Sequence, residues 1–453
     1  MHLRFYRLFV LFLYGILTVY THAQAPAATG PTEVTLFQNV RVLDKTGQLT
    51  LPTNVLVRAN VIERISTSPI PTDRSATTKI IEGGGRTLMP GLIDAHTHIL
   101  MQSIPMSVAM TADIGYLNLV AGKAANDMLL RGFTTIRDLG GPSFGLKMAI
   151  DQGITPGPRI YPSGAFISQT SGHGDFRMPY EIPRVIGGPL SHSEQMGVAA
   201  IADGPDEVRL RAREQLMKGA TQIKLMAGGG VASPYDPLDV AQYTEAEFRA
   251  AVEAAENWGT YVTVHAYTPK AIKTAIAGGV KCIDHGQLAD EASAKLMADK
   301  GIWWSLQPFL DDEDANPQPP GSPNRQKQLE MSAGTDMAYK LAKKYKIKTA
   351  WGTDTLFDAK LATRQGAQLA KMVRWYTPSE VLTMATADNA ELLAMSGRRN
   401  PYPGKLGVVE EGALADLLLV DGDPVANIKL IEDPAKNFLV IMKDGRIYKN
   451  TLN

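Results

Sequence analysis

Histidines placed at the ends of predicted strands, or in the loops that directly follow them, are the residues best suited to chemistry. The five with this placement are His96, His98, His173, His265 and His285. A neutral imidazole ring offers a nitrogen lone pair, which makes histidine a ligand for zinc and related metal ions. Histidines gathered at strand ends therefore predict a metal site.

His96 and His98 form a His-x-His pair in the segment GLIDAHTH. Residues two apart on a strand face the same side of the sheet, so both rings can reach one metal ion. Asp354, in the segment WGTD, follows the eighth predicted strand. Its carboxylate could bind metal and accept a proton from a water molecule. The alternatives are a chance polar pair for the histidines and a helix N-cap for Asp354.

His265 and His285 end two consecutive predicted strands, in the segments VTVHA and IDHG. Side chains at neighbouring strand ends can converge on a second metal ion. Taken singly, either residue would more often be a core histidine satisfied by a hydrogen bond. Their common position favours the metal site.

Lys224, in the segment TQIKLMAGGG, lies on the fourth predicted strand. An ammonium group has no lone pair and cannot bind a metal. Burial would lower its pKa and leave a neutral amine, which can react with carbon dioxide to form a carbamate with two metal-binding oxygens. The alternative is a buried lysine paired with an acid, and the residues alone favour this alternative.

Short apolar runs alternate with helical patterns over residues 91–399, which predicts a (β/α)8 TIM barrel of the α/β class. Helical periodicity covers residues 205–219, 244–257, 326–346 and 378–395. Reactive groups of such barrels lie at the carboxyl ends of the strands, where the candidate residues stand. The eight runs are Gly91–Ile93, Thr134–Ile136, Arg159–Ser163, Gln222–Met226, Tyr261–Val264, Lys281–Ile283, Ile302–Leu306 and Lys348–Trp351.

Short β-type runs occur at both ends of the chain, in residues 33–90 and 400–453. This arrangement predicts one small antiparallel β domain built from both chain ends. The polar, proline-rich residues 311–325 are expected to form a loop over the mouth of the barrel. The β runs are Glu33–Leu36, Val55–Arg58, Val61–Ile65, Lys79–Ile81, Gly404–Val409, Ala415–Val420, Asn437–Met442 and Arg446–Tyr448.

The N-terminus has the order of charges and apolar residues of a secretory signal. Arg4 and Arg7 precede the apolar run Leu8–Tyr20, and small residues follow. We expect a signal peptide over residues 1–23 and a linker over 24–32, hence a secreted or periplasmic protein with no membrane contact after cleavage. The apolar run is shorter than the ~20 residues that cross a bilayer, which disfavours an uncleaved anchor.

Composition excludes several other classes of protein. The chain of 453 residues carries 46 Lys and Arg against 46 Asp and Glu, and no basic stripe that would bind nucleic acid. Its single cysteine, Cys282, cannot form an internal disulfide. The length suits one large and one smaller domain.

A set of motifs, in order along nearly the whole chain, resembles the amidohydrolase superfamily. The motifs are GLIDAHTH, GFTTIRDLGG, the lysine of the fourth strand, VHAYTP, IDHG, WGTD, ATADNAELL and GALADLLLVDGDP. They are most similar to the binuclear branch that contains Xaa-Pro dipeptidases, imidazolonepropionase-like proteins and ochratoxin-hydrolysing amidohydrolases.

This resemblance implies two divalent metal ions, with zinc the usual one. His96, His98 and Asp354 would hold one ion, and His265 and His285 the other. Lys224, modified to a carbamate derived from carbon dioxide, would bridge them.

The resemblance also assigns two residues to the substrate. His173, in SQTSGHGD, would donate a hydrogen bond to the scissile carbonyl, and Tyr267 would bind the terminal carboxylate of the substrate. The alternatives are a histidine that fixes a glycine-rich loop and a tyrosine that packs at a strand end. Arg137 and Asp138 are expected to form a structural pair outside the site.

The resemblance implies an amide hydrolase with a small-molecule amide or dipeptide substrate. It would release a C-terminal amino acid from dipeptides or N-acyl amino acids, with ochratoxin A as one suitable substrate. The alternatives are a cyclic amide hydrolase of the imidazolonepropionase type and a non-catalytic barrel, while Lys224 disfavours a mononuclear deaminase. A homo-oligomer is expected, with an octamer as one form found near this branch.

Overall fold

The computed structural model describes residues 33–233 and 235–452 of the chain. The predicted signal peptide 1–23 and linker 24–32 lie outside the described residues. Within the described part, no helix is both long enough and apolar enough to span a membrane.

All eight apolar runs predicted for the barrel form strands, and these strands run parallel in two sheets. One sheet has the order β6-β7-β8, and the other β10-β9-β11-β12-β13-β14-β15. Their residues are buried throughout, as expected of parallel strands covered by helices. The strands are β6 (Leu92–Thr97), β7 (Phe133–Asp138), β8 (Arg159–Pro162), β9 (Phe166–Ser168), β10 (Ala199–Ile201), β11 (Ile223–Met226), β12 (Val262–Ala266), β13 (Cys282–His285), β14 (Trp303–Leu306) and β15 (Thr349–Trp351).

The third barrel strand is divided, which the sequence did not predict. β8 pairs with β7, whereas β9 pairs with β11 and with the short β10. The break falls at Gly164, whose φ of 72° lies in the left-handed region that glycine adopts readily. The pairing ladders therefore form two parallel sheets and not one continuous ring.

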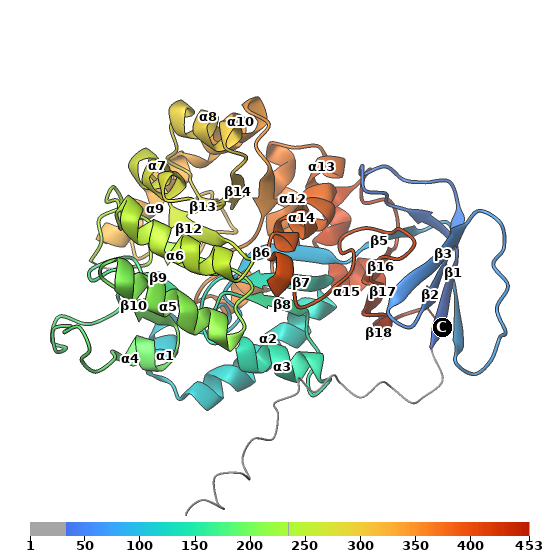
Figure 1. The fold of residues 1–453 in the computed structure, drawn as a ribbon. Coiled ribbons are helices and arrows are strands. Elements are labelled where there is room, and N and C mark those ends of the chain that lie inside the picture. Colours follow the sequence, from blue (N-terminus) through green and yellow to red (C-terminus); the bar gives the residue numbers. More distant parts are fainter. Residues whose placement is uncertain (1–32, 234, 453) are drawn as a thin grey trace, which may run out of the picture. The chain divides into compact units, whose positions relative to one another are not determined.

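Helices separate most of these strands and lie around them (Figure 1). The predicted helices 205–219 and 244–257 are confirmed as α5 and α6, and a capping box of Thr244 and Glu247 begins α6. The longer helices are α2 (Ile114–Leu130), α3 (Phe144–Asp151), α5 (Pro205–Lys218), α6 (Glu245–Asn257), α7 (Pro269–Ala277), α8 (Glu291–Asp299), α9 (Pro323–Ala333) and α10 (Thr335–Lys344). The shorter ones are α1 (Met106–Thr111), α4 (His192–Gln195), α11 (Ala359–Ala362), α12 (Gln365–Ala370), α13 (Pro378–Thr383), α14 (Asn389–Ala394) and α15 (Pro434–Asn437).

Two predicted helices are interrupted. Residues 326–346 form α9 and α10, which meet at Gly334, where a Cβ would lie 2.0 Å from the carbonyl oxygen of Gln287. Residues 378–395 form α13 and α14 joined by a π-helical stretch, Met384–Asp388. Periodicity alone does not register such local changes in winding.

The two chain ends build one sheet, in which β5 pairs with β16 (Figure 1). The prediction of an antiparallel domain is wrong in part, because β1 pairs in parallel with β4 and β5. The predicted run Gly404–Val409 forms no strand; Gly407 has a φ of 71° and packs against the backbone of Thr386. The strands are β1 (Val34–Val42), β2 (Thr53–Arg58), β3 (Val61–Ser66), β4 (Thr78–Glu82), β5 (Thr87–Pro90), β16 (Leu417–Val420), β17 (Phe438–Lys443) and β18 (Arg446–Asn450).

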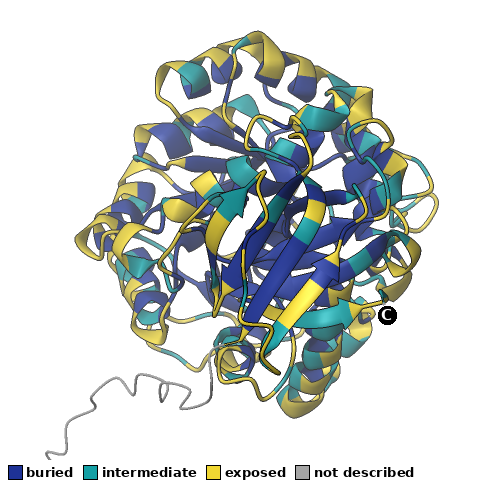
Figure 2. Cartoon of the chain, turned by 90° about the vertical axis from the view of Figure 1, so that its right-hand side faces the viewer, coloured by how far each residue is buried: buried dark blue, intermediate teal, exposed yellow. Residues whose placement is uncertain are grey.

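Buried contacts join this sheet to the strand–helix region. Arg159, at the start of β8, donates to both oxygens of Asp416 at 3.0 and 3.2 Å, and Lys443 donates to the Gly157 carbonyl at 2.8 Å. Exposed residues lie mainly on the outer sides of the helices, while the inner strands are buried (Figure 2). These contacts fix the terminal sheet to the amino-terminal end of β8, away from the carboxyl strand ends that carry the candidate residues.

Candidate metal centre

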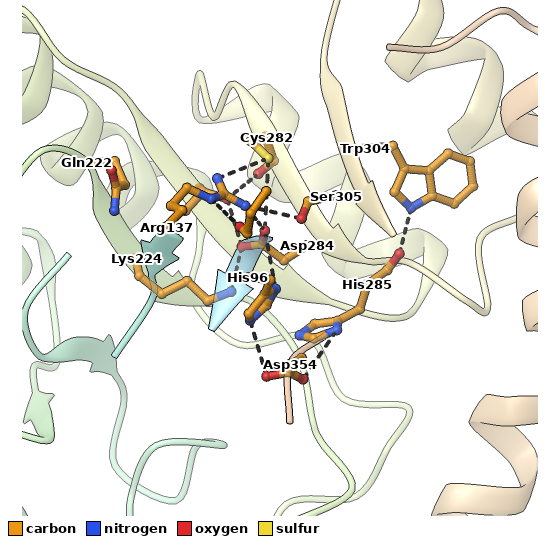
Figure 3. Close-up of polar contacts among 12 residues, drawn as sticks. His96, Arg137, Gln222, Lys224, Cys282, Asp284, His285, Trp304, Ser305 and Asp354 are labelled. Carbon is orange, nitrogen blue, oxygen red and sulfur yellow. Dashed lines mark hydrogen bonds and ion pairs between the residues drawn. The ribbon is translucent and has the colours of Figure 1, made fainter. Parts of the chain in front are cut away.

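His96, His98 and Asp354 come together as a compact group of three metal-ligand types. Their ligand atoms all lie within 4.8 Å of one another. Asp354 Oδ1 is 3.3 Å from His96 Nε2 and 3.1 Å from His98 Nε2, and Figure 3 shows His96 and Asp354 facing each other. The backbone N–H of Asp354 also donates to the His96 carbonyl at 2.8 Å. The first and eighth strands thus supply one half of the site.

A buried carboxylate that the sequence analysis missed holds this half together. Asp94 accepts hydrogen bonds from the Thr353 N–H at 3.1 Å, the Thr353 hydroxyl at 2.8 Å, the His96 N–H at 3.1 Å and the Gln365 amide at 2.8 Å. Burial raises the pKa of Asp94 to about 6, although these hydrogen bonds act to lower it. Asp94 therefore ties the segment after β15 to β6.

Gly352 allows the close approach on which this arrangement depends. A Cβ at Gly352 would lie 2.5 Å from the His96 backbone nitrogen and 2.6 Å from its Cβ. Any larger residue would push β6 away from Asp354. The glycine of the WGTD segment is therefore as necessary to the geometry as the aspartate.

His265 and His285 lie beside the first group. Their ring centroids are 4.5 Å apart, and the His285 ring is 4.9 Å from that of His96. His265 Nε2 lies 3.0 Å from the Gly229 carbonyl oxygen, an interaction that fixes the ring. His285 and Asp354 both have left-handed backbones, with φ of 75° and 47°, a conformation that functional sites often impose on non-glycine residues.

The protonation states and free atoms of this group fit a metal. Burial first, then the Lys224 charge, lowers the pKa of His96 well below its ordinary value. Burial and Lys224 also lower the pKa of His285 to about 4. Both rings are therefore neutral, with lone pairs available at neutral pH. His98 Nδ1, His285 Nδ1 and Asp354 Oδ1 are buried without a hydrogen-bond partner among the described residues.

Lys224 occupies the same cavity but is paired with an acid. Its Nζ donates to Asp284 Oδ2 at 2.5 Å, and both side chains are fully buried (Figure 3). Burial, together with the nearby charge of Arg137, lowers the pKa of Lys224, although Asp284 acts to raise it. Burial alone would raise the pKa of Asp284, yet Lys224 and Arg137 outweigh it and lower it to about 2. The unmodified chain thus has the acid-paired lysine considered as the alternative.

The predicted pair of Arg137 and Asp138 is wrong. Arg137 donates to Asp284 Oδ1 at 2.7 Å, to the Ala95 carbonyl at 2.6 Å and to the Ser305 hydroxyl at 3.1 Å (Figure 3). Adjacent residues on a strand point to opposite faces, so Asp138 cannot share this environment. Asp138 instead accepts from the Ile99 N–H at 2.8 Å and the Ser143 hydroxyl at 2.6 Å.

The side chains of His173 and Tyr267 both lie against the ring of His265. The His173 ring stacks on that of His265 with centroids 4.2 Å apart, and Tyr267 meets His265 edge-on at 4.8 Å. Burial raises the pKa of Tyr267 far above its ordinary value, which keeps its hydroxyl protonated. A cavity of 70 Å³ is lined by all eight residues that the sequence analysis selected, His96, His98, His173, Lys224, His265, Tyr267, His285 and Asp354.

A second cavity, of 130 Å³, adjoins the first and shares Tyr267 and Asp354 with it. Residues 314–316 and 318 line it, so the predicted loop does lie at the mouth of the site, although its last three residues, 323–325, begin helix α9. Ion pairs from Asp312 to Lys371 at 2.8 Å and from Asp311 to Arg325 at 2.7 Å fix this loop. Apolar side chains complete the wall, among them Phe309, Leu310, Met331, Leu356 and Phe357.

The sequence profile of the amidohydrolase family matches residues 87–448 of the chain. The chain is a member of the amidohydrolase family. Together with its hydrolase relatives, this membership shows that the amidohydrolase is an enzyme that cleaves amide C–N bonds. The resemblance inferred from the motifs is thereby confirmed.

Individual relatives agree with this assignment. The amidohydrolase is 32% identical over 378 residues to the ochratoxinase of Aspergillus niger, covering 80% of this chain and 75% of the relative. It resembles the crystal structure of a prolidase complexed with N-methylphosphonate-L-proline, with 33% identity and a TM-score of 0.84 over 92% of this chain and 100% of that one. A Xaa-Pro dipeptidase with bound methionine shows 27% identity and a TM-score of 0.78 over 92% and 100% of the two chains.

Proposed function

We propose that this amidohydrolase is a binuclear metal-dependent enzyme that releases a C-terminal amino acid from dipeptides or N-acyl amino acids. The observation that carries the proposal is the 70 Å³ cavity, which is lined by the candidate metal ligands together with His173 and Tyr267. The relatives named ochratoxinase, prolidase and Xaa-Pro dipeptidase support the same class of substrate.

The chain offers ligands for two divalent ions, with zinc as the expected metal. Bound there, the ions would lower the pKa of a water molecule and polarise the scissile carbonyl. Asp354 is placed to hold a proton, because its Oδ1 lines the cavity between His96 Nε2 and His98 Nε2. The proposed ligands are His96, His98 and Asp354 on one side, and His265 and His285 on the other, with Lys224 between them.

Lys224 would take part as a carbamate formed by its neutral amine and carbon dioxide, with release of one proton. Burial already lowers the pKa of this amine, which favours the neutral, reactive form. The reaction removes the positive charge that now faces Asp284. Arg137, at 2.7 Å from Asp284, would keep that carboxylate paired after the change. Asp284 would therefore stay paired, and the two metal ions would balance the negative charge of the carbamate itself.

His173 and Tyr267 would hold the substrate. A ring N–H of His173 would face the scissile carbonyl and stabilise the negative charge that develops on its oxygen. The Tyr267 hydroxyl, protonated at neutral pH, would donate to the free carboxylate of the departing amino acid. The adjoining 130 Å³ cavity, with Phe309 and Phe357 in its wall, suits an apolar side chain such as phenylalanine.

A second candidate is hydrolysis of a cyclic amide of the imidazolonepropionate type. It is favoured by a match to the imidazolonepropionase of Deinococcus radiodurans, 24% identical over 81% of this chain and 85% of the relative. A substrate of that kind would not need Tyr267 as a binder of the leaving amino acid's carboxylate.

We also propose how the parallel sheets close, where the protein is located and how it assembles. The two parallel sheets would close as a (β/α)8 barrel, supported by the bond from Asp354 N–H to the His96 carbonyl. Residues 1–23 would direct secretion or export to the periplasm. A homo-oligomer would form, supported by exposed apolar side chains such as Tyr180, Ile182 and Ile186.

Release of a free amino acid from a panel of amides tests the proposed function. The panel contains N-acetyl-Phe, N-acetyl-Leu, an Xaa-Pro dipeptide, ochratoxin A and imidazolonepropionate, incubated with zinc-loaded protein. We expect turnover of one or more open-chain members, and its loss in Asp354→Asn but not in Asp239→Asn, an exposed aspartate of the β11–α6 loop. Turnover of the cyclic member alone would favour the second candidate, and turnover of none would contradict both.

A further inference from the structure

We propose that Ser233 and Asp236 are positioning residues that orient His173, and that Lys327 fixes the loop that carries them. The inference rests on the proposed function in one respect, since it assumes that the orientation of His173 matters for turnover. None of these three residues belongs to the motifs of the metal centre. All three contact the His173 region through hydrogen bonds or short polar contacts.

One ring nitrogen of His173 is held from the β11–α6 loop. His173 Nδ1 lies 2.6 Å from the Ser233 hydroxyl and 3.5 Å from Asp236 Oδ2, and both partner side chains are buried. Asp236 Oδ2 also accepts the Gly230 N–H at 2.8 Å. Since Nδ1 is engaged on this side, Nε2 is the nitrogen left to face the cavity that His173 lines.

The two faces of the His173 ring are confined as well. On one face the ring stacks on His265 at 4.2 Å with an interplanar angle of 25°. On another side Gly230 approaches so closely that a Cβ there would lie 2.0 Å from ring Cε1. The stacking and the close approach of Gly230 therefore restrict displacement of the ring, and the contact at Nδ1 sets its rotation about the Cβ–Cγ bond.

Lys327 holds the loop itself. From helix α9 its ammonium donates to three backbone carbonyls of the loop, those of Gly230 at 3.2 Å, Ser233 at 2.9 Å and Asp236 at 2.7 Å. Three N–H donors are the full capacity of a lysine, and here all three meet residues of one short loop. Lys327 forms no ion pair with a carboxylate among residues 33–233 and 235–452. Its position thus serves the loop alone.

The three contacts form a chain from α9 to the cavity. Lys327 fixes the carbonyls of Ser233 and Asp236, their side chains engage Nδ1 of His173, and Nε2 of His173 is left toward the substrate. An orienting group behind a functional histidine fixes the position of its ring. If Ser233 and Asp236 only stabilised the loop, their buried side chains would not need to point toward the same ring nitrogen of His173.

Kinetics of single and double variants test this role. We expect Asp236→Asn and Ser233→Ala each to lower kcat about 10- to 100-fold with little change in KM, measured on the panel substrate with the highest turnover. In a His173→Ala background the same substitutions should cause no further loss, because they act through His173. Further losses of equal size in that background would overturn the proposal. Asp239→Asn, in the same loop but exposed, serves as the matched control.

Lys327 is tested by a pair of substitutions. Lys327→Met should reduce kcat in the same direction as Ser233→Ala, and Lys327→Arg, which keeps several donors, should restore most of it. Equal activity of Lys327→Met and the wild-type protein would remove Lys327 from the proposal.

A readout that needs no turnover separates this inference from the proposed function. Nuclear magnetic resonance of the zinc-loaded full chain with 15N-labelled histidine rings reports the state of each ring nitrogen. The His173 signals are identified by their loss in His173→Ala. We expect Asp236→Asn and Ser233→Ala to move the His173 signals and to leave those of the other histidines in place. Unchanged His173 signals would overturn the positioning role even if the enzyme hydrolyses the panel, whereas moved signals without turnover would contradict only the proposed function.

Discussion

The two halves of the metal centre differ in how far the unmodified chain assembles them. In the half made by His96, His98 and Asp354, the ligand atoms already lie within 4.8 Å of one another. In the half made by Lys224, His265 and His285, Lys224 binds Asp284 and His265 Nε2 contacts the Gly229 carbonyl. Backbone geometry therefore suffices for the first half, whereas the second requires chemical change of a side chain.

The charges of the two halves explain this difference. The first half combines a carboxylate with two rings and attracts a cation as it stands. The second contains the Lys224 ammonium, which repels a cation and which the pair with Asp284 satisfies. Conversion of Lys224 to a carbamate would reverse the sign of charge in the second half and make the two halves alike.

Asp354→Asn breaks the first half and should have the largest effect. The amide keeps the size of the side chain but removes the charge and the proton acceptor. We expect kcat to fall by about 10⁴-fold, measured as amino-acid release, with the thermal midpoint little changed. Activity within tenfold of the wild-type protein would show that the first half does not depend on this carboxylate.

Arg137→Met removes support from the second half. Asp284 would lose its 2.7 Å partner and remain buried with Lys224 alone. Breaking a buried ion pair from one side costs about 3–5 kcal/mol, so urea unfolding should report a loss of that order. An unchanged free energy of unfolding would mean that Arg137 is not needed to hold Asp284.

Lys224→Ala breaks the second half and leaves the first intact. We expect kcat to fall by about 100-fold. Added acetate or propionate should restore part of the activity, because a small carboxylate can enter the space of the missing carbamate. Lys218→Ala, on the last turn of α5, is an exposed control. Full activity of Lys224→Ala without any added acid would contradict the bridging role.

The pH dependence of stability tests the two halves together, because the His285 ring lies beside both His96 and His265. Burial lowers its folded-state pKa to about 4, below the unfolded value of about 6.5. Between these values the unfolded chain binds more protons, so stability is lost as the pH falls from about 6.5 to about 4. In the metal-free chain His285 alone should contribute about 1.4 kcal/mol per pH unit to the loss measured by urea unfolding. His285→Asn should have a shallower slope, and an equal slope would assign the effect to other groups.

The sequence predicts the first half well, because strand periodicity and the position after each strand place His96, His98 and Asp354 without knowledge of distant contacts. The same reasoning orders the eight strands predicted for the barrel. It cannot foresee the break at Gly164, since a three-residue strand leaves too little pattern to recognise. Nor does it foresee the π-helical stretch Met384–Asp388, where periodicity stays nearly unchanged.

Contacts between distant residues are the part that the sequence does not supply. Asp284 directly precedes a candidate ligand, yet its partners Lys224 and Arg137 depend on the register of three parallel strands. Adjacency in the sequence suggests a pair of Arg137 with Asp138, whereas the fold brings Arg137 to Asp284. Lys327 follows a separate loop, and only the folded chain brings it to Asp236.

Metal content of the purified chain, reconstituted with zinc and bicarbonate, tests the account most directly when the wild-type protein is compared with Lys224→Ala. We expect about two zinc ions per chain for the wild-type protein and about one for the variant, because the first half is complete without Lys224. The same stoichiometry in both proteins, at one or at two ions, would contradict a second half that depends on this lysine.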